Sequence, residues 1–332
     1  MFATVPSSNA TTILSTSRRV LADAVTIGYG SFLYEEASSA MRFSRLLLVG
    51  VLLLVDIAAG GQAGWKPLWN GRNLDGWTTW MRQPAPTSVV PGLQRNADGS
   101  YTEPIGSGRD PLNVFSVVNN IDGRPAIRIS GEVFGELRTR ESFENYHLRL
   151  QFKWGDKKWP PRDKPGTPRD SGLLYHVHAP PGQDGRTWAR SIELQIQEHD
   201  VGDLYAVGSV IAVRAKARPG TQPTLYDYDP AGEWTFFSQS QGASGRCIKQ
   251  PDNERPTGEW NTVELIAFGE DSIHIVNGTV VMRLHGPMRI DSDVPKPVTS
   301  GPLILQSEGA EVFYRDIEIR PITAIPPEFA GK

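Results

Sequence analysis

Short segments in which apolar and polar residues alternate recur along the chain from Trp65 to Arg320, separated by Gly, Pro, Asn and Asp. After Trp65 no stretch keeps an apolar stripe with a period of 3.6 residues over three turns, as an amphipathic helix would. The pattern therefore predicts an all-β protein. The expected strands are Ala126–Ser130, His147–Trp154, Gly172–His178, Ile192–Gln197, Thr262–Ala267, Ser272–Val276, Thr279–Leu284, Leu303–Gln306 and Glu311–Arg320.

The segment SIHIVNGTVVMRL gives the sharpest local prediction. Asn277 and Gly278 separate two alternating runs, and both residue types tolerate the positive φ angles that a two-residue hairpin turn requires. In contrast, residues 155–170 and 214–258 are rich in Pro, Gly and charge. These two stretches are expected to be long loops over one end or face of the fold.

The N-terminal region is expected to lie outside the folded domain. Residues 1–40 show neither strand alternation nor a helical stripe, and they precede a second methionine, Met41. From Met41 the chain has two arginines, an apolar run over residues 46–55 closed by Asp56, and small residues suited to cleavage. This order is typical of a signal peptide, and the apolar run is shorter than the roughly 20 residues of a membrane-spanning helix.

We therefore interpret residues 1–40 as a mis-assigned start or a disordered extension, 41–63 as the signal peptide, 64–322 as one domain and 323–332 as a C-terminal tail. The mature protein is expected to be exported to the periplasm or the extracellular space, with no membrane attachment after cleavage.

Charge and cysteine content exclude several classes of function. Cys247 is the only cysteine, so neither an intrachain disulfide nor a cysteine-based zinc site can form. The formal net charge of −3, with both signs interspersed, gives no basic surface for nucleic acid or an anionic membrane. A neutral or small ligand is expected.

Polar rows mark several of the predicted strands. In SIELQIQEHD, Glu193, Gln195 and Gln197 lie on one face, with neighbours in the row about 7 Å apart at a rise of about 3.3 Å per residue. Such amides and carboxylates suit sugar hydroxyls, which both donate and accept hydrogen bonds. The alternative is that each row simply faces water. Similar rows include Gln151 in one strand, His176 in another, and Gln306 with Glu308 in a third.

Glu198 and His199 follow the Glu193 row at the end of the strand. In a regular strand Glu198 points away from Glu193, whereas a bulge between them would bring both carboxylates into one cleft. A carboxylate beside an imidazole also makes Glu198 and His199 candidate ligands for a divalent cation.

The mature region resembles the 3-keto-disaccharide hydrolase domain family in six segments that occur in the same order. The matching segments are WKPLWNGRNLDGW (65–77), GELRTRESFENYHLRLQFKW (135–154), SGLLYHV (171–177), SIELQIQEHD (191–200), GEWNTVEL (258–265) and GPLILQSEGAEVFYRDIEIR (301–320). Asp170 and His176 depart from the Asn and Arg of the family pattern. These departures suggest a subgroup with its own substrate.

The resemblance implies a concanavalin-A-like jelly-roll sandwich of two antiparallel sheets that acts on glycosides oxidised at C3. A ketone at C3 acidifies the hydrogen on C2, so a base can remove it and the C1 oxygen can leave, with help from an acid and from enolate stabilisation. Glu193 and His176 are the expected acid/base pair, with Glu198 or His199 as a second acid or metal ligand. The side chains expected to bind substrate are Gln151, Gln195, Gln197, Gln306, Glu308, Trp188 and Tyr205.

Two other functions fit the sequence. Glu193-x-Gln195-x-x-Glu198 resembles the spacing in laminarinase-type retaining glycosidases, apart from Gln195. A non-catalytic carbohydrate-binding module is the other alternative, because a sandwich fold does not define a function. His147, His274 and His285 are interpreted as structural, since no acid stands in a matching row.

Overall fold

The structure is a computed structural model that describes residues 64–239, 244–290 and 294–331. All of them belong to one compact unit. The predicted N-terminal extension and signal peptide lie outside the described residues. Within these ranges, no helix has the length and apolar character needed to cross a membrane.

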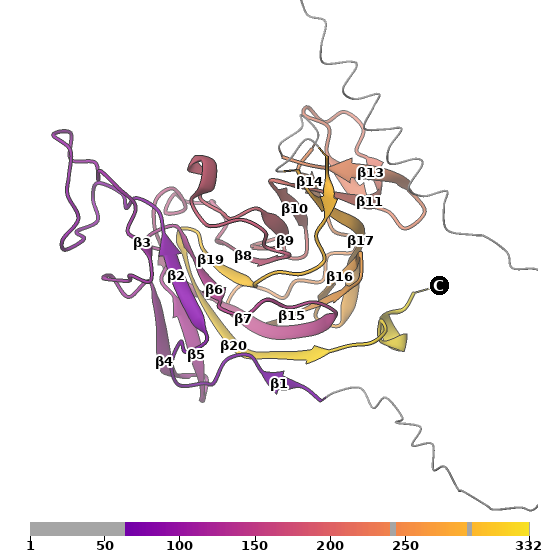
Figure 1. Ribbon diagram of the computed structural model, residues 1–332, viewed down its shortest axis with the longest axis horizontal. Coiled ribbons are helices and arrows are strands. Elements are labelled where there is room, and N and C mark those ends of the chain that lie inside the picture. Colours follow the sequence, from indigo (N-terminus) through magenta and orange to yellow (C-terminus); the bar gives the residue numbers. More distant parts are fainter. Residues whose placement is uncertain (1–63, 240–243, 291–293, 332) are drawn as a thin grey trace, which may run out of the picture. The chain divides into compact units, whose positions relative to one another are not determined.

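Two antiparallel sheets contain the strands (Figure 1). The 12-stranded sheet follows the order β12 (Tyr226–Tyr228), β11 (Ser209–Ala217), β17 (Thr279–Arg289), β16 (Asp271–Val276), β15 (Asn261–Phe268), β7 (Tyr146–Lys158), β20 (Ala310–Pro321), β5 (Arg124–Ile129) and β4 (Phe115–Ile121). Short strands join it at β20, β11 and β17: these are β1 (Lys66–Pro67), β13 (Glu233–Phe237) and β18 (Lys296–Pro297) respectively. The 8-stranded sheet follows the order β14 (Arg246–Cys247), β10 (Leu204–Val207), β9 (Ser191–Gln197), β8 (Asp170–Tyr175), β19 (Ile304–Ser307), β6 (Gly135–Thr139), β2 (Trp77–Met81) and β3 (Gly106–Ser107).

The hydrophobic core lies between the two sheets. Leu148, Leu150 and Phe152 from β7 belong to the same buried cluster as Ile192 and Leu194 from β9. These residues recur at every second position, as expected where one face of each strand packs against the other sheet. The structure therefore confirms the predicted all-β sandwich of two antiparallel sheets.

Buried hydroxyl groups also connect the sheets through the core. Ser171 Oγ of β8 lies 2.7 Å from Tyr314 Oη of β20, and Tyr175 Oη of β8 lies 2.8 Å from Ser272 Oγ of β16. Both contacts start on β8, so this strand is tied to the 12-stranded sheet by hydrogen bonds as well as by apolar packing.

The predicted hairpin is confirmed. Val276 of β16 pairs with Thr279 of β17, and Asn277 and Gly278 between them have φ angles of 49° and 79°. The Asn277 side chain accepts a hydrogen bond from the Thr262 amide at 2.8 Å, which ties the turn to β15.

Two predictions about the chain were wrong. The expected loop over residues 214–258 contains the end of β11 and all of β12, β13 and β14. Strand β8 ends at Tyr175 rather than His178, because His176 has a φ of 51° and leaves the extended conformation. The C-terminal tail packs Ile325 and Phe329 against a cluster that includes Ile266 and Ile273 of the 12-stranded sheet.

Candidate active site

The face of the 8-stranded sheet that points away from the core, here called the site face, carries the candidate site. Leu173, Leu194 and Leu305 point into the core cluster, so their neighbours in sequence point the opposite way. Pairing of β8, β9 and β10 places Leu174, Glu193 and Tyr205 in one cross-strand row. A second row contains Gln195, Gly172, Gln306, Glu136 and Trp80.

Gly172 leaves the space in which two polar side chains meet. A Cβ at this position would clash with Glu193 Oε1 and with Gln306 Oε1. The absence of a side chain on β8 therefore lets the carboxyl group from β9 and the amide from β19 approach each other over the sheet.

Glu193 is deeply buried, with 5% of its surface exposed, and its carboxyl group has acidic neighbours. Burial and the nearby charges of Glu308 and Asp170 raise its pKa well above the usual value, while Gln306 acts in the opposite direction. Tyr205 stands opposite Glu193 on β10, and burial raises the pKa of its phenol to about 12. Tyr205 therefore stays a hydrogen-bond donor at neutral pH.

An arginine and two acids form a compact cluster beside Glu193. Arg162, from the loop after β7, forms ion pairs with Asp170 and, at 3.0 Å, with Glu308. Gln197 donates a hydrogen bond to the same Asp170 carboxylate. Since one guanidinium serves two buried carboxylates, the pKa of Asp170 rises, mainly through burial and also through the charge of Glu308.

Glu136 of β6 was not singled out by the sequence analysis. Its side chain is 0% exposed, and neither carboxyl oxygen has a hydrogen-bond partner within the described ranges. Burial raises its pKa to about 8, although the charge of Arg138 acts to lower it. Glu136 lines a cavity of about 210 Å³ together with Thr78, Thr79, Trp80, Ser107, Arg138 and Pro181.

A comparison with known protein families shows to which family this chain belongs. Residues 64–320 match the 3-keto-alpha-glucoside-1,2-lyase-like domain. The chain belongs to this family.

Solved structures with similar folds share little sequence with this family member. Two structures of a protein from Parabacteroides distasonis, provisionally assigned as a glycosyl hydrolase, have 17% and 19% identity and TM-scores of 0.39 and 0.40. Each match covers 78% of this chain, and 94% and 100% of those chains respectively. A Bacillus licheniformis beta-glucanase has 10% identity and a TM-score of 0.34, covering 79% of this chain and 99% of its own. A search of the curated proteins found no match.

Glu198 does not share the environment of Glu193. The pairing of β9 with β8 runs without a register shift from Gln197 to Ile192, and β9 ends at Gln197. Glu198 lies beyond that end and accepts hydrogen bonds from Arg169 and Thr257. Although burial acts to raise its pKa, these partners lower it overall.

His199 lies in the turn after β9, where its backbone amide donates to Glu254 Oε2 at 2.7 Å. Across the described ranges, no three His, Cys, Asp or Glu side chains are grouped so that they could hold a metal ion. Glu198 and His199 therefore belong to no such group among the described residues.

His176 is 1% exposed, and neither ring nitrogen has a hydrogen-bond partner in the described part of the chain. Burial and the neighbouring His178 lower its pKa to about 4, so its imidazole is neutral at physiological pH. Because its φ is positive, strand alternation does not place it in a row with Glu193.

Trp188 precedes β9 and stacks on Phe134, with ring centroids 6.1 Å apart. The guanidinium of Arg82 lies 4.0 Å from the centroid of the same Phe134 ring.

Gln195 lies at the end of the second row opposite Trp80. Its side-chain oxygen accepts a hydrogen bond from the Ile196 amide at 3.0 Å.

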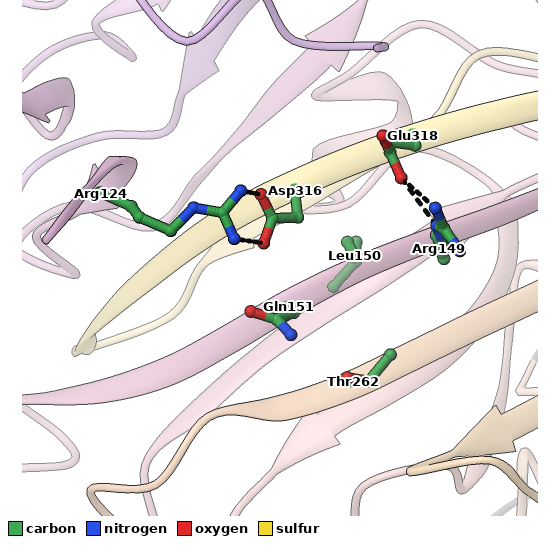
Figure 2. A pocket seen from close by; sticks show the side chains of 7 residues that line it. All are labelled: Arg124, Arg149, Leu150, Gln151, Thr262, Asp316 and Glu318. Atoms are coloured by element: carbon green, nitrogen blue, oxygen red, sulfur yellow. Dashed lines mark hydrogen bonds and ion pairs between the residues drawn. The ribbon is translucent and has the colours of Figure 1, made fainter. Parts of the chain in front are cut away.

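Gln151 lies on the other sheet. It belongs to β7 and lines a hollow of about 400 Å³ with two ion pairs, Arg124 with Asp316 and Arg149 with Glu318 (Figure 2). Arg315 Nε donates to Gln151 Oε1 at 2.8 Å. The structure therefore does not bring Gln151 to the Glu193 row.

The histidines interpreted as structural include two with acidic neighbours that strand alternation did not reveal. His147 Nε2 lies 2.8 Å from Glu264 Oε2, and His285 Nδ1 lies 2.8 Å from Asp271 Oδ1. Both contacts join neighbouring strands of the 12-stranded sheet, whereas the buried His274 contacts Tyr175 Oη and the Gly202 carbonyl oxygen.

Proposed function

We propose that this protein is an exported enzyme that cleaves 3-keto-glycosides or 3-keto-disaccharides by removing the C2 hydrogen and expelling the C1 oxygen. Membership of the 3-keto-alpha-glucoside-1,2-lyase-like family supports this substrate class. The observation that carries the proposal is the buried Glu193 carboxyl, which lies beside Gln306 in the space left by Gly172.

Glu193 acts as the base in this proposal. A carboxylate with a raised pKa holds a proton more strongly than an ordinary one, so it is better matched to the weakly acidic C2–H next to a ketone. Transfer of the C2 proton to Glu193 leaves the electron pair shared between C2 and the C3 oxygen as an enolate. The enolate then re-forms the C3 ketone and a C1=C2 double bond while the C1–O bond breaks.

Polar groups around Glu193 can stabilise the enolate and orient the sugar. Gln306 is fully buried beside Glu193 and acts to lower the pKa of that carboxyl, so in this proposal its amide orients the base and can also bind ligand. Tyr205 offers a phenol hydroxyl opposite Glu193. Donors aimed at the developing oxyanion would be the main electrostatic contribution to catalysis.

A laminarinase-type double displacement is less well supported. It needs two carboxyl groups about 5–5.5 Å apart in one cleft. The spacing that suggested such a pair was Glu193-x-Gln195-x-x-Glu198 with a bulge between the two glutamates, and β9 pairs with β8 in an unshifted register. Glu198 is also held by Arg169 and Thr257.

Turnover of defined sugars tests the proposal. The mature protein is incubated with a 3-keto-disaccharide and with the unoxidised parent disaccharide, with and without a chelator, and products are followed by NMR. We expect release of the leaving sugar from the 3-keto substrate alone. Binding without product would instead indicate a carbohydrate-binding module, and cleavage of the parent sugar would indicate an ordinary glycosidase.

A further inference from the structure

A cavity of about 210 Å³ lies at the β2–β6 end of the site face, and its lining includes none of the groups proposed to remove the C2 hydrogen. Trp80 and Thr78 of β2, Arg138 of β6 and Pro181 of the β8–β9 connection are among the residues that line it. The same connection covers Trp80, because a Cβ at Gly182 would lie 2.7 Å from the Trp80 ring. Ligand pockets for drug-sized molecules commonly measure about 300–1,000 Å³, so this cavity has room for one small ring.

The walls of the cavity combine an apolar surface with hydrogen-bonding groups. Trp80 offers an indole ring, and Arg138 and Thr78 offer donors. This mixture suits a neutral ring with hydroxyl groups, such as one monosaccharide unit.

Glu136 is the one lining residue with a buried carboxyl group. Both of its oxygens are unpartnered and its side chain is inaccessible to solvent, which is costly for a polar group that has no function there. Since burial keeps the carboxyl protonated at neutral pH, it can donate a hydrogen bond or a proton to a ligand.

The cavity adjoins the position assigned to the reacting sugar. Glu136 is paired with Gln306, and Gln306 borders the space over Gly172 that holds the Glu193 carboxyl. Two strand spacings, roughly 10 Å, separate the backbones of Glu136 and Gly172. A sugar ring between them would have the base on one side and Glu136 on the other.

We propose that this cavity is the subsite for the leaving sugar and that Glu136 is the catalytic acid that protonates the departing C1 oxygen. This inference rests on the proposed function. As the C1–O bond breaks, its electron pair moves to the oxygen, and the Glu136 O–H proton bonds to that oxygen. The products are the leaving alcohol, the 3-keto sugar with a C1=C2 double bond, and the Glu136 carboxylate. Loss of the C2 proton from Glu193 to water and uptake of a proton by Glu136 return both groups to their starting states.

The test uses Glu136→Gln, which has nearly the same shape as a protonated glutamate and no transferable proton. Its activity is measured on a 3-keto-disaccharide and on 4-nitrophenyl 3-keto-glucoside, whose leaving group needs no protonation. We expect a loss of about 100-fold or more on the disaccharide and less than about 5-fold on the nitrophenyl substrate. The matched control is Glu311→Gln, which removes a buried carboxyl that pairs with Arg128 on the other sheet and should change neither rate by more than about 2-fold.

A second measurement needs no variant. The wild-type rate is followed along a series of 3-keto-glucosides whose leaving groups differ in pKa, and a catalytic acid makes the rate nearly independent of that pKa. Equal losses on both substrates for Glu136→Gln, or a steep dependence for the wild type, would overturn the role of Glu136 while leaving the proposed function intact. Absence of wild-type turnover on every 3-keto-glycoside would overturn both.

Discussion

Two acids of the site face, Glu193 and Glu136, differ from the acids on the outer face of the 12-stranded sheet in how they are paired. On the 12-stranded sheet, Glu318 pairs with Arg149, Asp316 with Arg124, and Glu264 with His147. On the site face, Glu193 and Glu136 form no ion pair within the described residues, and both are more deeply buried than the acids of the other sheet.

The acids of the 12-stranded sheet find their partners within the fold. Glu193 and Glu136 have no ion-pair partner among the described residues, so a ligand could provide one. Burying a carboxyl group without a partner is unfavourable, and such groups with raised pKa values gather at functional sites. The Arg149–Glu318 and Arg124–Asp316 pairs contribute little to stability because they are accessible to water. The comparison therefore supports the proposal that the active site lies on the 8-stranded sheet.

Glu193→Gln should have the largest effect. Removal of the base is expected to lower kcat/KM for a 3-keto-disaccharide by about 10²–10⁴-fold, while folding is retained because the amide keeps the shape of the side chain. Glu318→Gln on the opposite sheet is the control and should leave the rate within about 2-fold. If Glu193→Gln kept full activity, the unpaired acid of the site face would matter no more for the rate than the paired acid of the other sheet.

Glu136→Gln should change how stability depends on pH. The pKa of Glu136 is raised from 4.5 to about 8 in the folded chain, so its contribution is fully present below pH 4.5 and is lost as the pH rises through 8. The variant lacks this titration and should be more stable than the wild type at pH 9 by up to roughly 5 kcal/mol, with little difference at pH 4.5. Urea unfolding at both pH values measures the difference, and equal curves at pH 9 would contradict the buried, unpaired state.

Gly172→Ala should reduce activity more than stability. The new Cβ meets the ends of two flexible side chains, Glu193 and Gln306, which can move aside at a cost of about 1 kcal/mol. Displacing the base by about 1 Å is expected to lower the rate by roughly 10–100-fold. Activity and melting temperature are measured together; a large loss of stability with normal specific activity would show that the gap serves packing instead.

Gln306→Ala and Gln151→Ala compare one amide from each face. Loss of the Gln306 amide should raise KM about 3–10-fold, since a hydrogen bond contributes about 1 kcal/mol. Gln151 contacts Arg315 on the far face, so Gln151→Ala should leave KM within about 2-fold. Equal effects on KM would restore Gln151 as a substrate-binding residue.

The sequence predicts the parts of the fold that local patterns determine. Asn277-Gly278 determines its hairpin within a few residues, and alternation places Glu193, Gln195 and Gln197 along one strand. Strand β13 was missed because its side chains are mostly exposed and follow no alternation, so pairing with β11 is what makes it a strand.

The candidate site depends on contacts between residues far apart in the chain. Glu136 is one acid in a short strand, and nothing near it in sequence shows that it pairs with Gln306 or that its carboxyl lacks a partner. For His176 the sequence predicted a place in a polar row that the backbone does not give it. Its positive φ ends the strand alternation on which that prediction rested. In both cases backbone geometry and register, rather than residue type, decide where the side chain lies.

Strand β8 has a mechanical consequence for the site. Alternate residues of this strand serve different purposes: Ser171 and Tyr175 anchor it through hydroxyl contacts to Tyr314 and Ser272, while Gly172 forms the floor under Glu193. A displacement of Gly172 would also displace Ser171 and Tyr175 and so disturb their hydrogen bonds to the other sheet. The position of Gly172 under Glu193 is therefore set partly from across the core, where Tyr314 of the opposite sheet contacts Ser171.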